Sequence, residues 1–244
     1  MAKLSGLFRE SRSTVVFTGA GVSTESGLPD FRSRTGLWQG VDPMALASIE
    51  AWRRRPNEFF TFYRQRLSGL QGARPNHAHL ILARLEAAGM VRAILTQNID
   101  GLHQEAGHRS VIELHGSLRQ ALCLACDRRY ASEILLENDL PSCKACGKPL
   151  KPDVVLFGEA LPAAAWDLAV RESCSCDLFV VVGSSLAVSP ANHLPALALE
   201  HGSKLAIVNL ERTHLDPQAS VVVSSPAGEV FIELSRELLS EATA

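Results

Sequence analysis

The chain has 244 residues with 46% hydrophobic side chains, 24 Lys and Arg, and 26 Asp and Glu, so its formal net charge at pH 7 is −2. This composition excludes a disordered chain, and the length allows one large domain with a smaller insertion. The balanced charge gives no electrostatic case for nucleic acid or a membrane surface as the main partner. The N-terminus lacks the apolar core of a signal peptide, and no run approaches the roughly 20 apolar residues of a membrane span, so we expect a cytoplasmic protein.

Short runs rich in β-branched and apolar residues alternate with helical stretches along the chain. These runs are Thr14–Thr18, Ala93–Gln97, Val111–Leu114, Val154–Phe157, Leu178–Val182 and Leu205–Asn209. Such runs are typical of strands buried on both faces, which predicts a parallel sheet. Helical spacing predicts helices at His77–Ala88 and Pro190–Glu200. The alternation therefore predicts an α/β fold with a doubly wound, Rossmann-type sheet.

Two segments interrupt the alternation. Residues 33–75 are predicted as loop and helix without a strong strand, and residues 119–153 contain paired cysteines. We therefore expect a large domain made of residues 1–32, 76–118 and 154–244. The two insertions are expected to form a smaller helical and metal-binding lobe.

The loops after the first two predicted strands are candidate binding sites. In Gly19–Ser23 the glycines would let the backbone approach a phosphate, although position 24 is Thr and the G-x-G-x-x-G fingerprint is incomplete, so a plain tight turn is an alternative. The amides and carboxylate of Gln97–Asp100 could hold ribose hydroxyls or a carboxamide. The alternative there is an Asx-type turn in which Asp100 caps the next helix.

Three further loops follow predicted strands. His115 titrates near neutral pH and could act as a general base, or it could be a hydrogen-bonded structural residue. Small hydroxyl residues at 183–185 could bind phosphate or ribose, and the acidic residue in 209–211 could accept a hydrogen bond from an adenosine ribose. Because all five loops follow strands of one sheet, we expect them at the same edge.

The cysteines carry the most specific local signal. Cys123-x2-Cys126 and Cys143-x2-Cys146 are separated by sixteen residues, which is the spacing of a four-thiolate zinc site. A catalytic zinc keeps one position for water, whereas a closed Cys-only site is structural. We therefore expect one structural Zn²⁺ in the small lobe.

Taken together, the motifs resemble those of sirtuins, the NAD-dependent protein-lysine deacylases. In chain order they are Gly19-Ala-Gly-Val-Ser23, Pro29-Asp-Phe-Arg32, Thr96-Gln-Asn-Ile-Asp100, Leu114-His-Gly116, the cysteine pairs, Phe157-Gly-Glu159, Gly183-Ser-Ser185 and Val208-Asn209. The resemblance spans nearly the whole chain. It implies that NAD and an acylated protein lysine meet between the two lobes, giving nicotinamide, 2′-O-acyl-ADP-ribose and free lysine.

The resemblance also implies roles for single residues. It implies catalytic roles for His115, Asn98 and Asp100, with His115 as general base on a ribose hydroxyl. It implies that Asp30–Val41 is a mobile loop over NAD and that the peptide contacts Val154, Phe157, Gly158 and Glu159. It implies that NAD contacts Gly19, Ala20, Gly21, Ser23, Phe31, Arg32, Gln97, Asn98, Ile99, Asp100, Gly183, Ser184, Ser185, Asn209, Leu210, Glu211 and Ala227.

Tyr63 and Arg66 relate to the question of which acyl group the protein removes. They are three residues apart in a predicted helix and resemble the Tyr-x-x-Arg pair of sirtuins that remove succinyl and malonyl groups. A guanidinium can bind a carboxylate through two hydrogen bonds and a phenol can add a third. Helix spacing alone favours an inward Tyr and a solvated Arg, but their place in the motif order favours the carboxylate site. The choice among acetyl, succinyl and malonyl stays open.

Two other functions remain as alternatives. One is NAD-dependent ADP-ribosyl transfer to protein, and the other is a zinc-ribbon interaction module on an NAD-binding scaffold. The presence of His115 favours deacylation, because transfer of the acyl group to ribose needs a base. We expect acylated lysine in proteins or peptides as the partner, no direct nucleic-acid binding, and a monomer.

Overall fold

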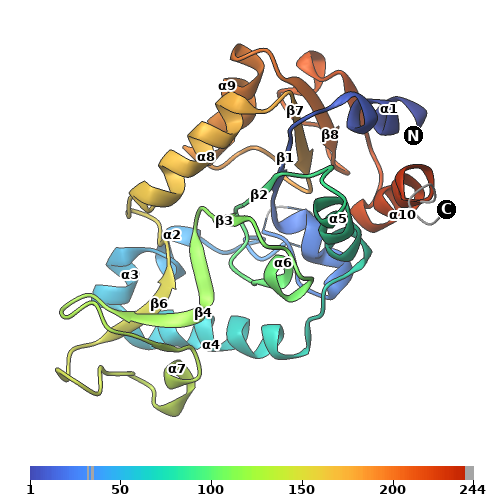
Figure 1. Ribbon diagram of the computed structural model, residues 1–244. Coiled ribbons are helices and arrows are strands. Elements are labelled where there is room, and N and C mark those ends of the chain that lie inside the picture. The colour runs from blue at the N-terminus through green and yellow to red at the C-terminus, as the bar shows by residue number, and fades with distance from the viewer. Residues whose placement is uncertain (32, 34–35, 240–244) are drawn as a thin grey trace.

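The computed structural model describes residues 1–31, 33 and 36–239. Its large lobe contains a six-stranded sheet in the order β3-β2-β1-β7-β8-β9, in which every neighbouring pair is parallel (Figure 1). The strands are β1 (Thr14–Thr18), β2 (Ala93–Thr96), β3 (Val111–Glu113), β7 (Leu178–Val182), β8 (Lys204–Val208) and β9 (Val221–Val223). The prediction of a doubly wound parallel sheet is confirmed.

Helices cover both faces of this sheet because successive strand side chains point to opposite sides. Val16 packs in one apolar core with the first helix set, whereas Val15 and Phe17 pack in a second core with the other set. The first set is α1 (Ala2–Glu10), α5 (His77–Ala87) and α10 (Ala227–Leu238), and the second is α8 (Ala163–Ser175) and α9 (Leu194–Glu200), as Figure 1 shows. Both strand faces are therefore buried, as the apolar runs predict.

The remaining small elements lie in the connections. They are the short helix α6 (Leu102–Glu105) and the 3₁₀ helices η1 (Ala20–Ser26), η2 (Ala191–His193) and η3 (Asp216–Gln218). The helix predicted at 77–88 is confirmed as α5. The one predicted at 190–200 is divided into η2 and α9. Among the described residues, no helix is long and apolar enough to cross a membrane.

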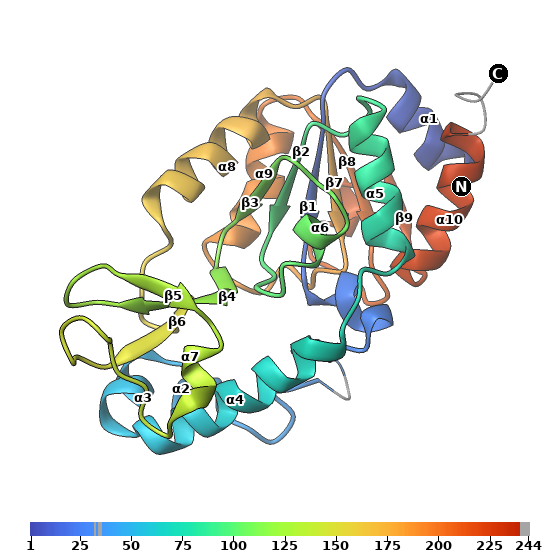
Figure 2. The ribbon, with the colours of Figure 1, turned by 60° about the horizontal axis from the view of Figure 1, so that its bottom comes forward.

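A second lobe lies beyond the carboxyl ends of the large sheet (Figure 2). Its three strands are antiparallel in the order β5-β4-β6, formed by β4 (Gly116–Cys123), β5 (Arg129–Ala131) and β6 (Leu150–Val154). The helices around them are α2 (Pro43–Leu46), α3 (Ile49–Arg54), α4 (Pro56–Gly72) and α7 (Ile134–Glu137). Phe59, Phe60, Leu118 and Leu150 share its core, so helices from one insertion and strands from the other fold as one body.

The predicted parallel strand Val154–Phe157 is wrong. Val154 is the last residue of β6, which pairs antiparallel with β4 in the small lobe. Beyond it the chain stays extended and bonds elsewhere: Val155 N donates to His115 O at 2.8 Å, and Phe157 forms an isolated bridge with Ser48. The run is apolar because it packs between the lobes, and β propensity alone does not report which sheet a strand joins.

The strand β9 was not predicted. It has only three residues, Val221–Val223, and lies at the edge of the sheet with its side chains partly exposed. A run of three residues is too short to show the alternation of a strand, so the sequence also carried no sign of a binding loop after it. The limits of the two lobes stay a prediction.

Candidate active site

The loops after β1 and β7 cross at the point where the strand order reverses, which is where open α/β sheets bind ligands. Gly21 N donates to Gly183 O at 2.9 Å. A Cβ on Gly19 would lie 2.7 Å from Gly183 O, and one on Gly183, whose φ is +61°, would lie 2.3 Å from Val22 N. These positions therefore need glycine so that two backbones can touch, which is a stronger reason than a plain tight turn.

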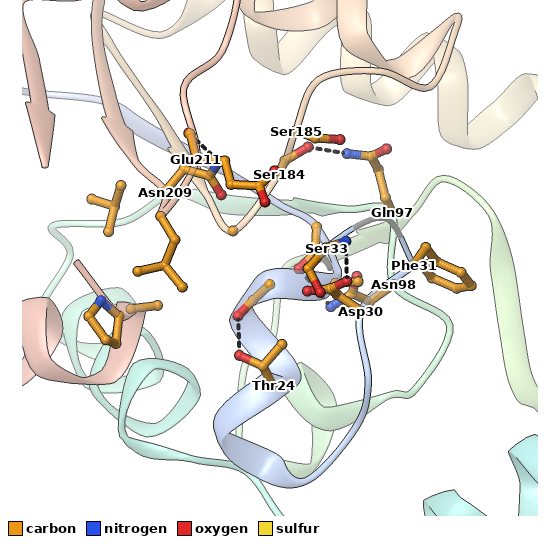
Figure 3. A pocket seen from close by; sticks show the side chains of 18 of the residues that line it. Thr24, Asp30, Phe31, Ser33, Gln97, Asn98, Ser184, Ser185, Asn209 and Glu211 are labelled. Carbon is orange, nitrogen blue, oxygen red and sulfur yellow. Dashed lines mark hydrogen bonds between the residues drawn. The ribbon is translucent and has the colours of Figure 1, made fainter. Parts of the chain in front are cut away.

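A first cavity opens at this crossing (Figure 3). The predicted residues that line it are Gly19, Ala20, Gly21, Phe31, Gln97, Asn98, His115, Gly183, Ser184, Ser185, Asn209, Leu210, Glu211 and Ala227. The loop expected over NAD contributes Asp30 and Ser33, and the lining residues that were not predicted are Thr24, Val188, Val208, Ser225 and Pro226. Ser225 and Pro226 follow β9, so recognising that strand would have pointed to them. The expectation that the five loops meet at one edge is confirmed.

Three predicted cofactor residues do not line this cavity. Ser23 and Asp100 lie behind it, and Ile99 lines a second cavity described below. Arg32 lies outside the described residues, so its predicted contact is not placed.

A hydrogen-bond network fixes Asn98 at the floor of the first cavity. Asn98 Nδ2 donates to Gly19 O at 3.2 Å and to Ser23 Oγ at 3.1 Å, and Ser23 Oγ donates to Asp100 Oδ2 at 2.8 Å. Asp100 also accepts from Leu102 N at 2.9 Å, so the Asx-turn alternative describes one of its two bonds. Burial raises the pKa of Asp100, and these hydrogen bonds oppose that rise.

Two further contacts order the polar side chains of the cavity. Gln97 Nε2 donates to Ser184 Oγ at 2.9 Å, which joins the β2 loop to the β7 loop. Asn209 Nδ2 donates to Glu211 O at 2.8 Å at the far end of the cavity (Figure 3). The neighbouring Leu210 is 64% exposed. The cavity is thus polar along one side and open at the β8 end.

His115 stands between the first cavity and the second. Its Nδ1 lies 3.0 Å from Gln97 O, which can only accept, so Nδ1 carries the hydrogen and Nε2 is the basic nitrogen. Burial lowers the pKa of His115, and the bond to Gln97 opposes that effect. The ring is therefore neutral at pH 7 and able to accept a proton.

The second cavity lies between the lobes and shares Phe31, Gln97, His115 and Val188 with the first. All six residues expected to contact substrate line it: Tyr63, Arg66, Val154, Phe157, Gly158 and Glu159. Val155 and Leu156, inside the segment 154–159 expected to pair with the peptide, line it too, as does Trp38 of the loop expected over NAD. Residues that were not predicted there are Ala47, Phe62, Leu161, Ser189 and Pro190. A ligand in each cavity would meet the other at His115.

Tyr63 and Arg66 come from the same face of α4. Tyr63 is 4% exposed and its ring centroid lies 4.5 Å from that of Phe59. The Arg66 guanidinium lies 4.9 Å from the Phe31 ring centroid, and it makes no hydrogen bond or ion pair with any residue between 1 and 239 that the structure describes. Burial raises the pKa of Tyr63 and lowers that of Arg66. Arg66 is therefore a partly buried cation in the cavity and not a solvated surface arginine.

The four cysteines gather as their spacing predicts. Their Sγ atoms lie within 4.8 Å of one another, and Cys123 Sγ is 3.5 Å from Cys146 Sγ while Cys126 Sγ is 3.7 Å from Cys143 Sγ. Tetrahedral Zn–S bonds of 2.3 Å place sulfur atoms about 3.8 Å apart, so the cluster fits one Zn²⁺. All four positions are thiols, which leaves no site for a reacting water and makes the zinc structural.

Comparison with known proteins gives one family. Residues 19–190 match the Sir2 family. The NAD-dependent protein deacetylase 1 of Geobacillus kaustophilus is 51% identical over 230 residues, which cover 93% of this chain and 94% of that protein. The NAD-dependent protein deacylase 2 of Pyrobaculum aerophilum is 44% identical over 235 residues, which cover 96% of this chain and 94% of that protein. A solved structure of Sir2 with a p53 peptide and NAD⁺ superposes with a TM-score of 0.89 at 38% identity, covering 97% of this chain and 98% of that one.

Proposed function

The chain belongs to the Sir2 family and is an NAD-dependent protein deacylase, and from that premise we propose that its substrates include lysines whose acyl group ends in a carboxylate, such as succinyl-lysine and malonyl-lysine. The proposal assigns NAD to the first cavity and the acyl-lysine to the second. NAD would supply the ribose: the acyl oxygen of the substrate would displace nicotinamide from it, and the acyl group would then pass to a ribose hydroxyl, with uptake of water and release of the lysine amine. The remaining chemistry belongs to residues of this chain.

His115 is the proposed general base. His115 lines both cavities, and Gln97 O orients the ring through Nδ1. A neutral imidazole there accepts the proton of a ribose hydroxyl as that oxygen attacks the acyl carbon. Asn98, held by Gly19 O and Ser23, is proposed to position the ribose, and Asp100 keeps Ser23 in place.

The peptide is proposed to lie along the extended segment 154–159. Main-chain pairing with such a segment recognises the backbone and tolerates many side chains, so one enzyme can act on many proteins. The acylated side chain then enters the second cavity beside Phe31, Tyr63 and Arg66.

The observation that carries the acyl preference is the unpaired guanidinium of Arg66. A cation removed from water is costly unless an anion or a set of acceptors compensates it. Tyr63 and Asp100 favour its charge electrostatically, but no described residue forms an ion pair or a hydrogen bond with the guanidinium, which faces the cavity that would hold the acyl group. An acyl carboxylate would supply the partner, with the Tyr63 hydroxyl adding a hydrogen bond.

The test is nicotinamide release with acetyl-lysine and succinyl-lysine peptides of one sequence. We expect Arg66→Met to lower kcat/KM for the succinyl peptide by about 100-fold, because a charged two-point contact is worth about 3 kcal/mol. Turnover of the acetyl peptide should change by less than about threefold, since acetyl carries no charge.

Arg64→Met is the matched control, because Arg64 lies on the same helix and pairs with Asp139 on the surface at 3.4 Å. It should leave both substrates unchanged. Equal losses on both peptides in Arg66→Met, or faster turnover of acetyl by the unaltered enzyme, would contradict the carboxylate site.

A further inference from the structure

Lys151 and Glu159 form a buried ion pair that the proposed reaction does not use. Lys151 Nζ lies 3.1 Å from Glu159 Oε2, and the two side chains are 4% and 22% exposed. Lys151 Nζ also donates to Val154 O at 2.8 Å, and Glu159 Oε2 accepts from Leu156 N at 2.9 Å. The pair therefore spans the segment proposed to bind peptide.

Glu159 shares its cavity with Arg66. Among the described residues that line the second cavity, Glu159 is the only carboxylate and Arg66 the only permanent cation. Opposite charges in one partly desolvated cavity attract strongly. Glu159 is thus the carboxylate of the cavity lining that would compete with a substrate carboxylate, whereas Asp100, which also attracts Arg66, lies outside that lining.

The structure shows which cation forms an ion pair with Glu159. It pairs with Lys151 and leaves Arg66 without an ion pair in the described part of the chain. Lys151 approaches from β6, behind the cavity wall, and does not itself line the cavity. Its charge cancels that of Glu159, so the wall carries the net positive charge of Arg66.

We propose that Lys151 is a positioning residue for acyl specificity: by holding Glu159 in an ion pair, it keeps Arg66 free for the acyl carboxylate and removes a charge that would repel it. This inference rests on the proposed function. Without Lys151 the cavity would hold one cation and one anion, and the anion would compete with substrate. Removing both members of the pair would restore the balance with Arg66 alone.

A purely structural role makes a different prediction. If Lys151 served only to hold Val154 O, its loss would disturb the peptide segment and affect every acyl substrate alike. The double variant carries both Lys151→Met and Glu159→Gln. Like the single variant Lys151→Met, it lacks the hydrogen bond from Lys151 to Val154 O. The two variants differ only in the Glu159 charge, so comparing them isolates the electrostatic effect.

The experiment measures kcat/KM for succinyl-lysine and acetyl-lysine peptides on the zinc-loaded enzyme and takes their ratio. We expect Lys151→Met to lower the succinyl-to-acetyl ratio by about tenfold, and the double variant to return it to within about threefold of the unaltered enzyme. Lys204→Met is the control, because Lys204 pairs with Glu10 on the surface at 2.7 Å. Its ratio should not change.

A ratio as low in the double variant as in Lys151→Met, or an unchanged ratio in Lys151→Met, would overturn the inference. If Lys151→Met does not fold, as thermal unfolding would report, Lys151→Gln replaces it, because Gln removes the charge and keeps an N–H donor. Arg66→Met separates the two hypotheses. An unchanged ratio in Arg66→Met means that the carboxylate site itself has failed, whereas a fall there without a fall in Lys151→Met defeats only the role of Lys151.

Discussion

At the scale of single residues, Gln97 links the two halves of the proposed chemistry. Its side chain bonds to Ser184 in the first cavity and its carbonyl oxygen orients His115 at the junction. The same residue thus aligns the cofactor loop after β7 with the base. Because Gln97 is bonded through both its side chain and its carbonyl oxygen, it has few alternative conformations. Proton transfer needs such a fixed arrangement of the groups around the base.

We predict that the buried His115 makes the reaction depend on pH. Burial lowers its pKa, so the neutral, basic form persists below the ordinary histidine value of about 6.5. We expect kcat/KM to stay constant from neutral pH down to a midpoint below about 6.5 and to fall tenfold per unit beneath it. The measurement is the pH profile of nicotinamide release with acetyl peptide.

His115→Gln should abolish turnover while the thermal unfolding temperature changes little. His201→Gln is the control, since His201 is exposed at the end of α9, lines neither cavity, and hydrogen-bonds through its ring to Leu197 O. A profile with its midpoint above 6.5 would show that another group limits the rate.

Ser23 Oγ forms hydrogen bonds with both Asn98 and Asp100. Ser23→Ala removes the acceptor of Asn98 Nδ2 and the donor to Asp100 in one change. We expect the free energy of unfolding to fall by about 1 kcal/mol and kcat/KM by at least about tenfold, because a buried carboxylate loses a hydrogen bond. Urea unfolding and nicotinamide release measure the two effects. A normal rate would show that Asn98 needs no support from this residue.

At the scale of elements, three buried histidines join α5 and α6 beneath the sheet edge. The ring centroids of His79 and His103 are 4.8 Å apart, and those of His103 and His108 are 5.2 Å apart. His103 Nε2 lies 2.9 Å from Thr18 Oγ1, at the end of β1. Burial lowers the pKa of His79 to about 4 and lowers that of His103 well below its ordinary value.

These histidines predict loss of stability in acid. Between about pH 6.5 and pH 4 these rings are protonated in the unfolded chain but stay neutral in the folded protein. The free energy of unfolding therefore falls as pH falls. For His79 alone the loss reaches about 3 kcal/mol at the lower end. Urea unfolding at several pH values measures it. His79→Asn should flatten the dependence, whereas the exposed His201→Gln should not, and an equal slope in both would contradict the assignment.

The crossing of the β1 and β7 loops predicts a large penalty at Gly183. Gly183→Ala adds a Cβ 2.3 Å from Val22 N at a φ of +61°, whereas Gly202→Ala has a similar φ of +88° with nothing within 4 Å. The strain of the dihedral, about 1 kcal/mol, is common to both, so any excess in Gly183→Ala comes from the backbone contact. We expect that excess to exceed about 2 kcal/mol in urea unfolding, with loss of NAD binding by calorimetry. Equal penalties would mean that the loops separate easily.

At the scale of the whole molecule, the four-cysteine cluster supports the wall of the second cavity, which is proposed to hold the acyl group. Cys123 and Cys143 belong to the same core as Tyr63 and Val154. A structural zinc can contribute on the order of 10 kcal/mol to folding a small module. We therefore expect a chelator to abolish deacylation and to melt the small lobe before the large one, seen as two transitions in calorimetry. NAD binding should weaken less than peptide binding, and a single unchanged transition would contradict this role.

The sequence predicts most of the large lobe because its strands are buried on both faces and its binding residues follow strand ends. That rule brings Gln97, His115 and Ser184 to one cavity without any knowledge of the fold. It fails at Val154–Phe157, where an apolar run pairs with the other sheet, and at Val221–Val223, which is too short to show a period. The free charge of Arg66 and the pairing of Lys151 with Glu159 depend on packing between segments remote in sequence, which no local pattern reports.

The first cavity is formed mainly by the strand-end loops of the large sheet, whereas the second takes one wall from the small lobe, and the two meet at His115. The side proposed to hold the acyl group is formed mainly by α4 and the segment after β6. Substitutions there can therefore alter which modification is removed while the bond-breaking apparatus stays intact. Evolution could diversify this enzyme by exchanging one lobe, and a laboratory could do the same by transplanting residues 43–72 and 150–159 together as a specificity cassette.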